Sequence, residues 1–280
     1  MTSSRRTWWI TGASRGLGRA LACAAADAGD LVVATGRRLG DLPTGKRLVA
    51  LQLDVRDPDA VTTTVDRIVV DHGRIDVVVN NAGYGLVGAL EECTDDDLQA
   101  ILDTTVLGSA RVARAALPHL RAQGAGHLLF VSTTGAVGTM PMLGAYNAAK
   151  WALEGMAEAL AAEVAEAGVR VSILEPGGID TEWATGSMAF ARPESAYDGL
   201  RTRLFGTSEV PWPAAGTGGG TPPEKIATAI LAHVDDPDDD RLRVLLGDDA
   251  PDQVAAALTG RLADYRRDPR FAPALERVQG

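Results

Sequence analysis

Tyr146 and Lys150 are the two residues of this chain whose types and spacing most clearly suggest acid–base chemistry. They are four residues apart, so on a helix their side chains lie on one face. A free tyrosine has a pKa of about 10 and is a poor acid–base group at neutral pH. A nearby ammonium group favours the phenolate, which is why a lysine is useful at this spacing. Taken alone, the alternative for this pair is an ordinary contact on a helix surface.

A glycine-rich turn near the start of the chain has the form of a phosphate-binding loop. Gly12, Gly16 and Gly18 follow the apolar segment of residues 8–10 and precede a helical run. Side chains at these points would hold the backbone away from a pyrophosphate, whose charge is stabilised by N–H groups at the positive end of a helix. The alternative for one such turn is a plain strand-to-helix connection.

Two further short motifs complete a set with a fixed order along the chain. The four motifs are residues 11–18 (TGASRGLG), 80–83 (NNAG), 146–150 (YNAAK) and 176–181 (PGGIDT). In this order and at these separations they resemble the motifs of the short-chain dehydrogenase/reductase family, over about residues 7–246. The resemblance implies a Rossmann fold and hydride transfer between NAD(P) and a carbonyl or alcohol.

The resemblance also implies which residues contact the cofactor. Asp54 would contact the adenine, Lys150 would hydrogen-bond the nicotinamide ribose, and Thr181 would hold the nicotinamide amide. The other implied contacts lie in the glycine turn, beside the cofactor and just before Thr181. They are Gly12, Ser14, Gly16, Leu17, Gly18, Asn81, Ala82, Gly83, Pro176, Gly177 and Ile179.

The end of the second expected strand bears on which nucleotide binds. NAD-binding proteins usually place an acidic residue there, on the ribose 2′-hydroxyl. Gly36 stands at this position and is followed by Arg37 and Arg38. Arg37 could bind a 2′-phosphate through paired hydrogen bonds. Arg15 is the other cation that NADP-dependent family members use, so we expect NADP(H). Two surface arginines without a ligand are the alternative.

Two positions depart from the family pattern around the catalytic pair. The family has a serine thirteen residues before the tyrosine, and Thr133 stands there. Its hydroxyl can bond the substrate oxygen, but its methyl stiffens χ1 and narrows the pocket. Ser132 would point to the other face of the strand. The family also has an asparagine that anchors a proton-relay water in the long fourth helix. Thr105 stands at that position and would hold a water less well or not at all.

An alternating pattern of strands and helices predicts how these residues come together. Strand-like segments that are largely apolar alternate with helical ones, which predicts a parallel sheet buried on both faces. We therefore expect one α/β domain over residues 1–280, a doubly wound three-layer Rossmann fold. The expected strands are residues 8–10, 31–35, 48–53, 75–79, 127–131, 169–174 and 242–246, and the expected helices are 19–27, 58–71, 95–122, 145–167, 223–233 and a covering helix at 252–267.

The alternation stops after Thr181, and residues 182–221 predict a substrate lid. A stretch of about 40 residues without periodicity is more often a lid than a connector, and closure would exclude water from hydride transfer. We therefore expect a medium-sized apolar ketone or alcohol as substrate. The alternative is that the large groups only pack the segment onto the body. These groups are Trp183, Met188, Phe190, Tyr197, Leu200, Phe205 and Trp212, with Arg192, Arg201 and Arg203 able to face solvent.

Composition narrows the remaining classes. The net charge of −10 would repel nucleic acid and anionic membranes. No apolar run reaches the roughly 18 residues of a membrane span, and the four histidines lack metal-ligand spacing. The polar N-terminus does not resemble a signal peptide, so a cytoplasmic protein is expected. The acidic run at residues 235–240 predicts a solvated turn.

Three functional hypotheses remain open. The first is an NADPH-dependent carbonyl reductase, or the reverse alcohol dehydrogenase. The second is a family member with non-redox chemistry, and the third is a non-catalytic nucleotide sensor or scaffold. Thr105 and Thr133 support the last two, whereas the intact Tyr146–Lys150 pair argues against a sensor. The family resemblance also implies a homodimer or homotetramer through the helices at 95–122 and 145–167, with close approach at Ala148, Ala149, Ala152, Gly155 and Ala159.

Overall fold

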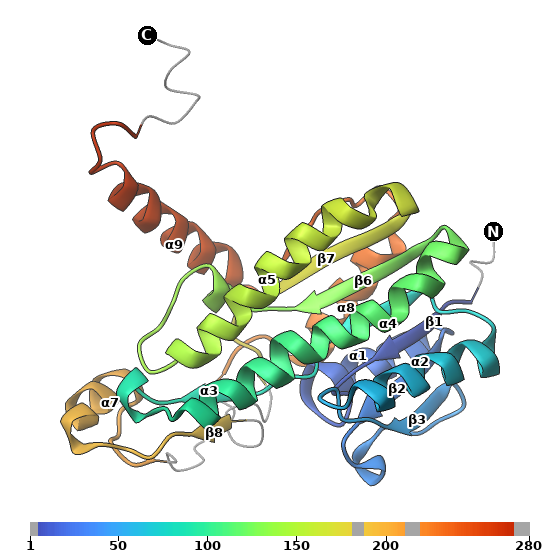
Figure 1. Ribbon diagram of the computed structural model, residues 1–280. Coiled ribbons are helices and arrows are strands. Elements are labelled where there is room, and N and C mark those ends of the chain that lie inside the picture. Colours follow the sequence, from blue (N-terminus) through green and yellow to red (C-terminus); the bar gives the residue numbers. More distant parts are fainter. Residues whose placement is uncertain (1–4, 181–187, 211–218, 272–280) are drawn as a thin grey trace.

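A seven-stranded parallel sheet forms the centre of the molecule (Figure 1). The computed structural model describes residues 5–180, 188–210 and 219–271. The strand order is β3-β2-β1-β4-β6-β7-β9, and all neighbouring strands in it run parallel. The prediction of a doubly wound α/β fold is therefore confirmed. The strands are β1 (Thr7–Ile10), β2 (Leu31–Gly36), β3 (Leu48–Gln52), β4 (Val77–Asn80), β6 (Gly126–Val131), β7 (Val169–Pro176) and β9 (Arg243–Leu246).

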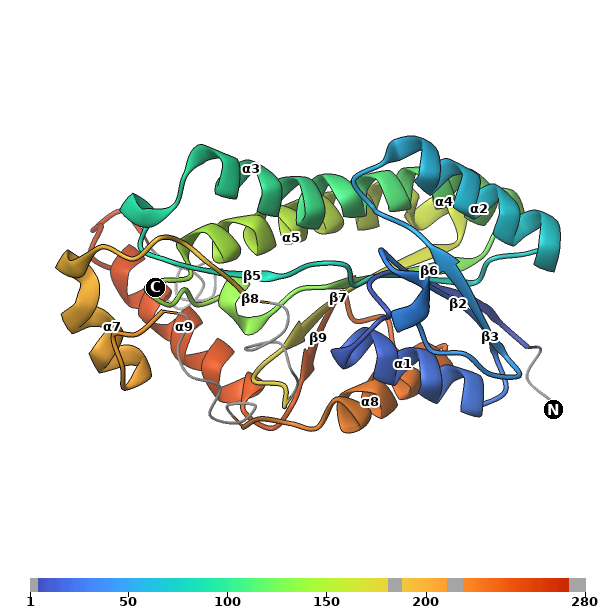
Figure 2. The ribbon, with the colours of Figure 1, turned by 90° about the horizontal axis from the view of Figure 1, so that it is seen from below.

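Helices cover both faces of this sheet and make the three layers (Figure 2). One layer holds α1 and α8, and the other holds α2, α4 and α5. The helices begin and end close to the predicted bounds, because capping residues such as Asp57 and the left-handed Gly73 stand at their ends. These helices are α1 (Gly16–Asp27), α2 (Pro58–His72), α4 (Gly108–Gln123), α5 (Gly144–Val164) and α8 (Pro223–Asp235).

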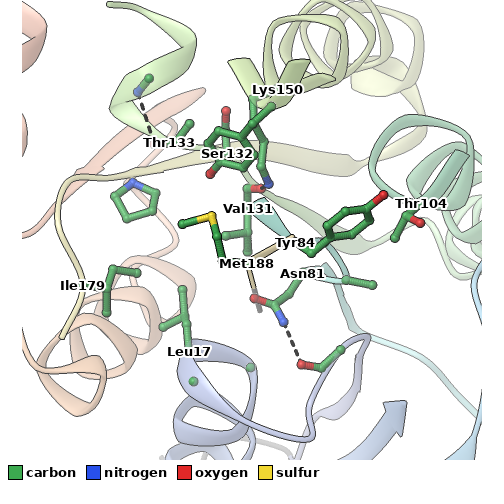
Figure 3. A pocket seen from close by; sticks show the side chains of 18 of the residues that line it. Leu17, Asn81, Tyr84, Thr104, Val131, Ser132, Thr133, Lys150, Ile179 and Met188 are labelled. Carbon is green, nitrogen blue, oxygen red and sulfur yellow. Dashed lines mark hydrogen bonds between the residues drawn. The ribbon is translucent and has the colours of Figure 1, made fainter. Parts of the chain in front are cut away.

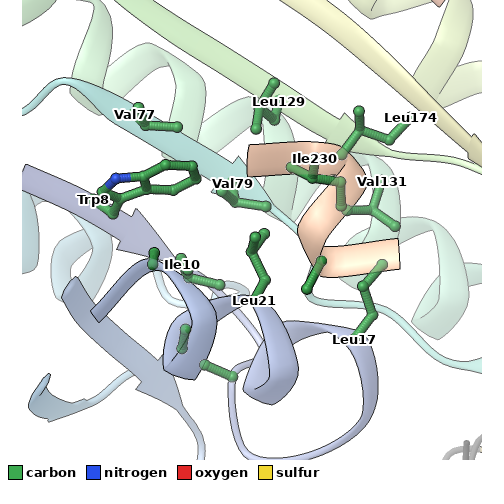
Figure 4. Packing of buried hydrophobic residues seen from close by; sticks show 14 of the residues in the cluster. Trp8, Ile10, Leu17, Leu21, Val77, Val79, Leu129, Val131, Leu174 and Ile230 are labelled. Atoms are coloured by element: carbon green, nitrogen blue, oxygen red, sulfur yellow. The ribbon is translucent and has the colours of Figure 1, made fainter. Parts of the chain in front are cut away.

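The central strand β1 shows how the sequence specifies both layers at once. Its successive side chains point to opposite faces. Trp8 and Ile10 pack toward α1 and α8, where they meet Leu21 and Ile230 (Figure 4). Trp9 packs into the opposite layer. The side chains of Trp8, Trp9 and Ile10 are fully buried, which explains why this part of the strand is apolar.

The direction of the chain through the sheet reverses between β1 and β4. The chain runs outward from β1 through β2 to β3, then crosses back to β4 and runs outward on the other side. In doubly wound sheets a crevice opens at the carboxyl ends of the strands at such a reversal. The predicted glycine turn follows β1 and the predicted NNAG motif ends β4, so both lie at this crevice.

The predicted helix at residues 95–122 is interrupted. It consists of α3 (Asp95–Leu102) and α4, joined by the π-helical turn Asp103–Leu107. Close packing accounts for the position of this turn, because a Cβ on Gly108 would lie 2.6 Å from the side chain of Val55. Single π turns inside helices often mark functional sites, and this one contains Thr105.

Two histidines that lie far apart in the sequence meet at the amino ends of the strands. His127 and His233 both contact the hydroxyl of Ser172, each at 2.9 Å. His233 Nδ1 lies 2.6 Å from Asp239, which also binds Arg241. The predicted solvated turn at 235–240 is therefore wrong for Asp239, whose side chain turns inward because it has a buried partner. No described group of three or more acidic, histidine or cysteine side chains could hold a metal ion.

The C-terminal helix differs from the predicted covering helix. Helix α9 (Ala250–Tyr265) projects from the body (Figure 1), and only its first residue is buried. Many of its apolar residues are alanines, which have little area to bury. Its first turns still reach the crevice, as described below. Among the described helices, none is long and apolar enough to cross a membrane.

Candidate active site

A cavity of about 830 Å³ opens at the carboxyl ends of the strands. It joins the glycine turn to the catalytic pair, as Figure 3 shows for Leu17 and Asn81 on one side and Lys150 on another. Thr105 lies just outside its lining, and Thr181 lies outside the described residues. The predicted residues that line it are Gly12, Ser14, Arg15, Gly16, Leu17, Gly18, Arg37, Asp54, Asn81, Ala82, Gly83, Thr133, Tyr146, Lys150, Pro176, Gly177 and Ile179.

The glycine turn is locked to the segment after β4. Asn81 Nδ2 donates to the carbonyl oxygens of Thr11 and Gly12 at 2.9 and 3.0 Å. A Cβ on Gly18 would lie 2.4 Å from Asn81 Nδ2, and Gly12 has a φ of +64°. Both glycines are therefore needed for this close approach. The start of α1 has no side-chain cap hydrogen bond, so its N–H groups can bind a pyrophosphate.

The cationic residues at the nucleotide end differ in their partners. Arg38 binds Asp41 at 2.7 Å, and Arg56 holds the carboxylate of Asp54. The Arg56 hydrogen bonds lower the pKa of Asp54. Within the described part of the chain, the side chains of Arg15 and Arg37 make no hydrogen bond or ion pair, and both line the cavity. These two arginines are thus available to an anionic group.

Tyr146 and Lys150, the predicted catalytic pair, are buried at the far end of the cavity. Burial raises the pKa of Tyr146 to about 12, and a hydrogen bond with Thr133 opposes this rise. Burial lowers the pKa of Lys150 to about 8, and the Glu154 carboxylate opposes this fall. Lys150 Nζ lies 5.8 Å from the centre of the Tyr146 ring and donates to Val131 O at 2.6 Å. Lys150 is thus mostly charged at neutral pH and close to the phenol.

Ser132 and Thr133, which follow β6, point in different directions. Thr133 Oγ1 accepts a hydrogen bond from Gly135 N at 3.1 Å, and the same hydroxyl makes the hydrogen bond with Tyr146. Ser132 donates to Glu154 instead. Ser132 thus points away from Tyr146, as the strand alternation predicts. Thr133 is therefore the hydroxyl beside Tyr146.

Thr105 lies beside the pair without completing it. Its Oγ1 is buried and has no hydrogen-bond partner among the described residues. Thr105 Oγ1 and Lys150 Nζ lie 3.7 and 3.8 Å from the point where a Cβ on Gly83 would be. A buried hydroxyl without a partner is costly, so this position is suited to a water molecule or to a ligand hydroxyl.

The substrate end of the cavity contains residues that the sequence reasoning missed. Tyr84 extends toward Thr104 (Figure 3), and Asn147 stands next to the catalytic tyrosine. Their only sequence signal was proximity to the NNAG and YNAAK motifs. Met140, Leu143, Ala189 and Gln253 come from three separate segments, and no local pattern joins them.

The described part of the predicted lid is anchored to the body. Strand β8 (Met188–Phe190) pairs with β5 (Gly85–Val87) in a separate small sheet. Arg201, on α7 (Asp198–Phe205), is 1% exposed and bonds Glu92 at 2.5 Å. Of the two possibilities that the sequence left open for Arg201, it is buried rather than facing solvent, because a buried carboxylate pairs with it.

The large apolar groups of the lid segment mostly do not reach the cavity. Met188 lines it, whereas Phe190, Tyr197, Leu200 and Phe205 do not. Tyr197 donates instead to Glu91 at 2.7 Å. The alternative that these groups pack the segment onto the body thus describes the other four better. Trp183 and Trp212 lie outside the described residues.

Comparisons with known proteins agree with this geometry. The model of the short chain dehydrogenase family matches residues 6–190. The chain belongs to this family. Among curated relatives of this short-chain dehydrogenase, oxidoreductase BOA17 of Botryotinia fuckeliana is 38% identical over 264 residues, which cover 90% of this chain and 92% of the relative. The family and this relative identify the protein as an oxidoreductase.

Further family members extend the comparison. A short-chain dehydrogenase structure from Streptomyces avermitilis has a TM-score of 0.83 and 36% identity, and the match covers 94% of this chain and 96% of that one. Human 17-beta-hydroxysteroid dehydrogenase type 1 is 34% identical over 210 residues, which cover 70% of this chain and 63% of the human enzyme.

Proposed function

We propose that this short-chain dehydrogenase transfers a hydride between NADP(H) and a carbonyl or alcohol group of a medium-sized apolar substrate. The observation that supports this most is the position of Tyr146, Lys150 and Thr133. They stand together in one cavity, between a phosphate-binding turn and a largely apolar wall. When bound, the nicotinamide supplies or accepts the hydride.

Tyr146 is the general acid and base of the proposed reaction. In reduction its hydroxyl gives a proton to the carbonyl oxygen, and in oxidation it takes the proton of the alcohol. The Thr133 hydrogen bond opposes the rise that burial causes in the pKa of Tyr146, and a charged Lys150 would stabilise the phenolate further. The Thr133 hydroxyl, which is hydrogen-bonded to Tyr146, would bind the substrate oxygen beside the phenol and orient it.

A preference for NADP(H) is supported by two arginines whose side chains make no hydrogen bond or ion pair with other described residues. Arg15 and Arg37 line the nucleotide end of the cavity, and Gly36 brings no carboxylate to repel a phosphate. Charge-assisted hydrogen bonds contribute about 1.5–3 kcal/mol each. Either arginine alone would therefore favour the phosphorylated nucleotide severalfold or more.

An apolar substrate is supported by the far wall of the cavity. Met140, Leu143, Met188 and Ala189 form its apolar part, whereas Asn147 is a polar group suited to orienting a ligand. The name of the human relative indicates that it acts on a hydroxysteroid, an apolar alcohol of this class.

A homo-oligomer through α4 and α5 belongs to the same proposal. Ala148, Ala152, Gly155 and Ala159 are exposed along α5 and would permit close approach. Ala149, which was expected among them, is buried and packs against the small cluster with Tyr146 instead. Light scattering that reports only monomer would contradict this part.

The decisive experiment measures NADPH oxidation with ketones of rising apolar area and compares NADPH with NADH binding. We expect Tyr146→Phe to lose turnover by about 10²–10⁴-fold, with NADPH affinity unchanged because only the acid–base hydroxyl is removed. The two other hypotheses predict no ketone-dependent oxidation. A variant that keeps its activity would exclude Tyr146 as the acid.

A further inference from the structure

A buried carboxylate stands one helical turn behind the proposed catalytic lysine. Glu154 follows Lys150 by four residues on α5, so the two side chains share the helix face that carries Tyr146. Glu154 is 7% exposed. A charge held this deep is costly unless it is paired, so the partners of Glu154 indicate what it does.

Two groups from other segments hold this carboxylate. The hydroxyl of Ser132, just after β6, donates to Glu154 Oε1 at 2.5 Å. Arg243 Nε, on β9, lies 3.8 Å from Glu154 Oε2 and 3.3 Å from Glu175 Oε1 on β7. Glu158, one turn further along α5, is exposed and binds Arg243 at 2.7 Å. With Lys150, these are the charged groups recorded around Glu154.

The carboxylates of Glu154 and Glu175 both lie near Arg243, but different groups act on the pKa of each. Burial raises the pKa of Glu175 to about 7, and repulsion by Glu154 adds to the rise. Burial also raises the pKa of Glu154, but the Ser132 hydrogen bond, Arg243 and Lys150 all oppose this. Glu154 is therefore the better stabilised anion of the two, and it lies on the helix of the lysine.

We propose that Glu154, oriented by Ser132, is a positioning residue that keeps Lys150 charged and thereby sets the pH range in which Tyr146 exchanges its proton. The catalytic consequence rests on the proposed function, whereas the electrostatic part is a property of the protein alone. Without the charge of Glu154, the desolvation of Lys150 is unopposed, and the lysine loses its proton at lower pH. A neutral lysine no longer stabilises the phenolate.

The chain has only three lysines, which makes a direct test practical. Lysine labelled with carbon-13 at Cε is followed by NMR between about pH 6 and 11 in the protein without cofactor. Lys46 and Lys225 are exposed and serve as internal references. Glu154→Gln removes the charge but keeps an oxygen that can accept from Ser132. We expect the Lys150 midpoint to fall by about one pH unit or more in this variant.

Two further variants make the result specific. Glu158→Gln removes a carboxylate from the same helix that binds the same arginine, and it should leave the Lys150 midpoint unchanged. Glu154→Asp keeps the charge and should restore most of the midpoint, which a loss of folding could not explain. In ketone reduction by NADPH, the pH at which kcat falls should shift to lower pH in Glu154→Gln by the same amount as the midpoint.

Each result decides the matter. A Lys150 midpoint that moves no further in Glu154→Gln than in Glu158→Gln overturns the proposal, whatever the activity. A midpoint that moves while the pH profile of kcat stays in place overturns the catalytic role. If the unaltered protein reduces no ketone, the proposed function fails instead, and the titration still decides whether Glu154 sets the charge of Lys150.

Discussion

The cavity has two walls that are built in different ways. The nucleotide wall consists of the glycine turn and the segment after β4, and the substrate wall consists of the residues around Tyr84, Met188 and Gln253. On the nucleotide wall, main-chain atoms make the decisive contacts, as when Asn81 donates to the carbonyl of Gly12. On the substrate wall, side chains from distant segments meet, among them Tyr84, Met188 and Gln253. The first arrangement needs particular residue types at fixed spacing, whereas the second needs only that the rest of the fold holds its segments in place.

On the substrate wall, a buried ion pair holds two of these segments in place. Glu92 Oε1 accepts from Arg201 and from the backbone of Glu194, and its Oε2 accepts from Ala89 N. Arg201 also binds the carbonyl of Glu194. The pair thus fastens the segment after β8 to the segment after β5, which keeps Met188 at the cavity.

Breaking this pair should give the largest effect and should be confined to the substrate wall. Arg201→Met leaves Glu92 buried without its cation, which typically costs about 3–5 kcal/mol. We expect kcat/KM for an apolar ketone to fall by more than about tenfold, with NADPH affinity unchanged. Ketone kinetics and calorimetric titration of NADPH measure the two walls separately.

The neighbouring Arg203 provides the matched control. It lies on the same short helix but is exposed, so Arg203→Met should change neither quantity. Replacing both partners, as Glu92→Gln with Arg201→Met, should recover part of the lost stability, because no unpaired charge remains. A loss of NADPH affinity in Arg201→Met would show that the two walls are not separable.

The corresponding test of the nucleotide wall is Gly18→Ala. A Cβ on Gly18 would lie 2.4 Å from Asn81 Nδ2 and 2.6 Å from Gly12 O. Such overpacking costs about 1–3 kcal/mol, so Gly18→Ala should weaken NADPH binding roughly tenfold or more. Calorimetric titration measures the affinity. Gly155→Ala, on α5 where nothing lies within 4 Å, should bind NADPH normally and be slightly more stable.

The same difference explains what the sequence could predict. The strands, the layers and the positions of Gly18, Asn81, Tyr146 and Lys150 follow from apolar runs and contiguous motifs, and the fold is confirmed. The buried state of Arg201 could not be predicted, because its partner lies more than a hundred residues away. The roles given to the site residues stay predictions, since they depend on ligands rather than on the fold.

Within the nucleotide wall, one charge should control the choice of nucleotide. Arg37→Asp removes a cation and places a carboxylate near the expected 2′-phosphate. We therefore expect the difference in binding free energy that favours NADPH over NADH to shrink by about 2–3 kcal/mol. Arg38→Asp is the control, because Arg38 is already bound to Asp41. Equal affinity for NADPH and NADH in the unaltered protein would contradict the assignment.

The smallest effect concerns Glu175, a buried carboxylate beside the cavity residue Pro176. It lies on β7 just before Pro176 and Gly177, which line the cavity, and it faces Arg243 together with Glu154 of α5. Because burial raises its pKa from the usual 4.5 to about 7, the folded protein binds more protons than the unfolded chain between these values. The free energy of unfolding should therefore fall as pH rises from 4.5 to about 7.

Glu175→Gln should remove this fall and gain about 1–2 kcal/mol at pH 8 relative to the unaltered protein. The amide keeps an oxygen that can accept from Arg243, so the packing of both walls is preserved. Urea unfolding at pH 5 and pH 8 measures the change, and Glu158→Gln, exposed on the same arginine, should show no such gain. If Glu175→Gln is less stable than the unaltered protein at pH 8, the Glu175 carboxylate is a stabilising partner of Arg243. The end of β7, which carries the cavity residue Pro176, would then depend on an ion pair, as the lid depends on Glu92 and Arg201.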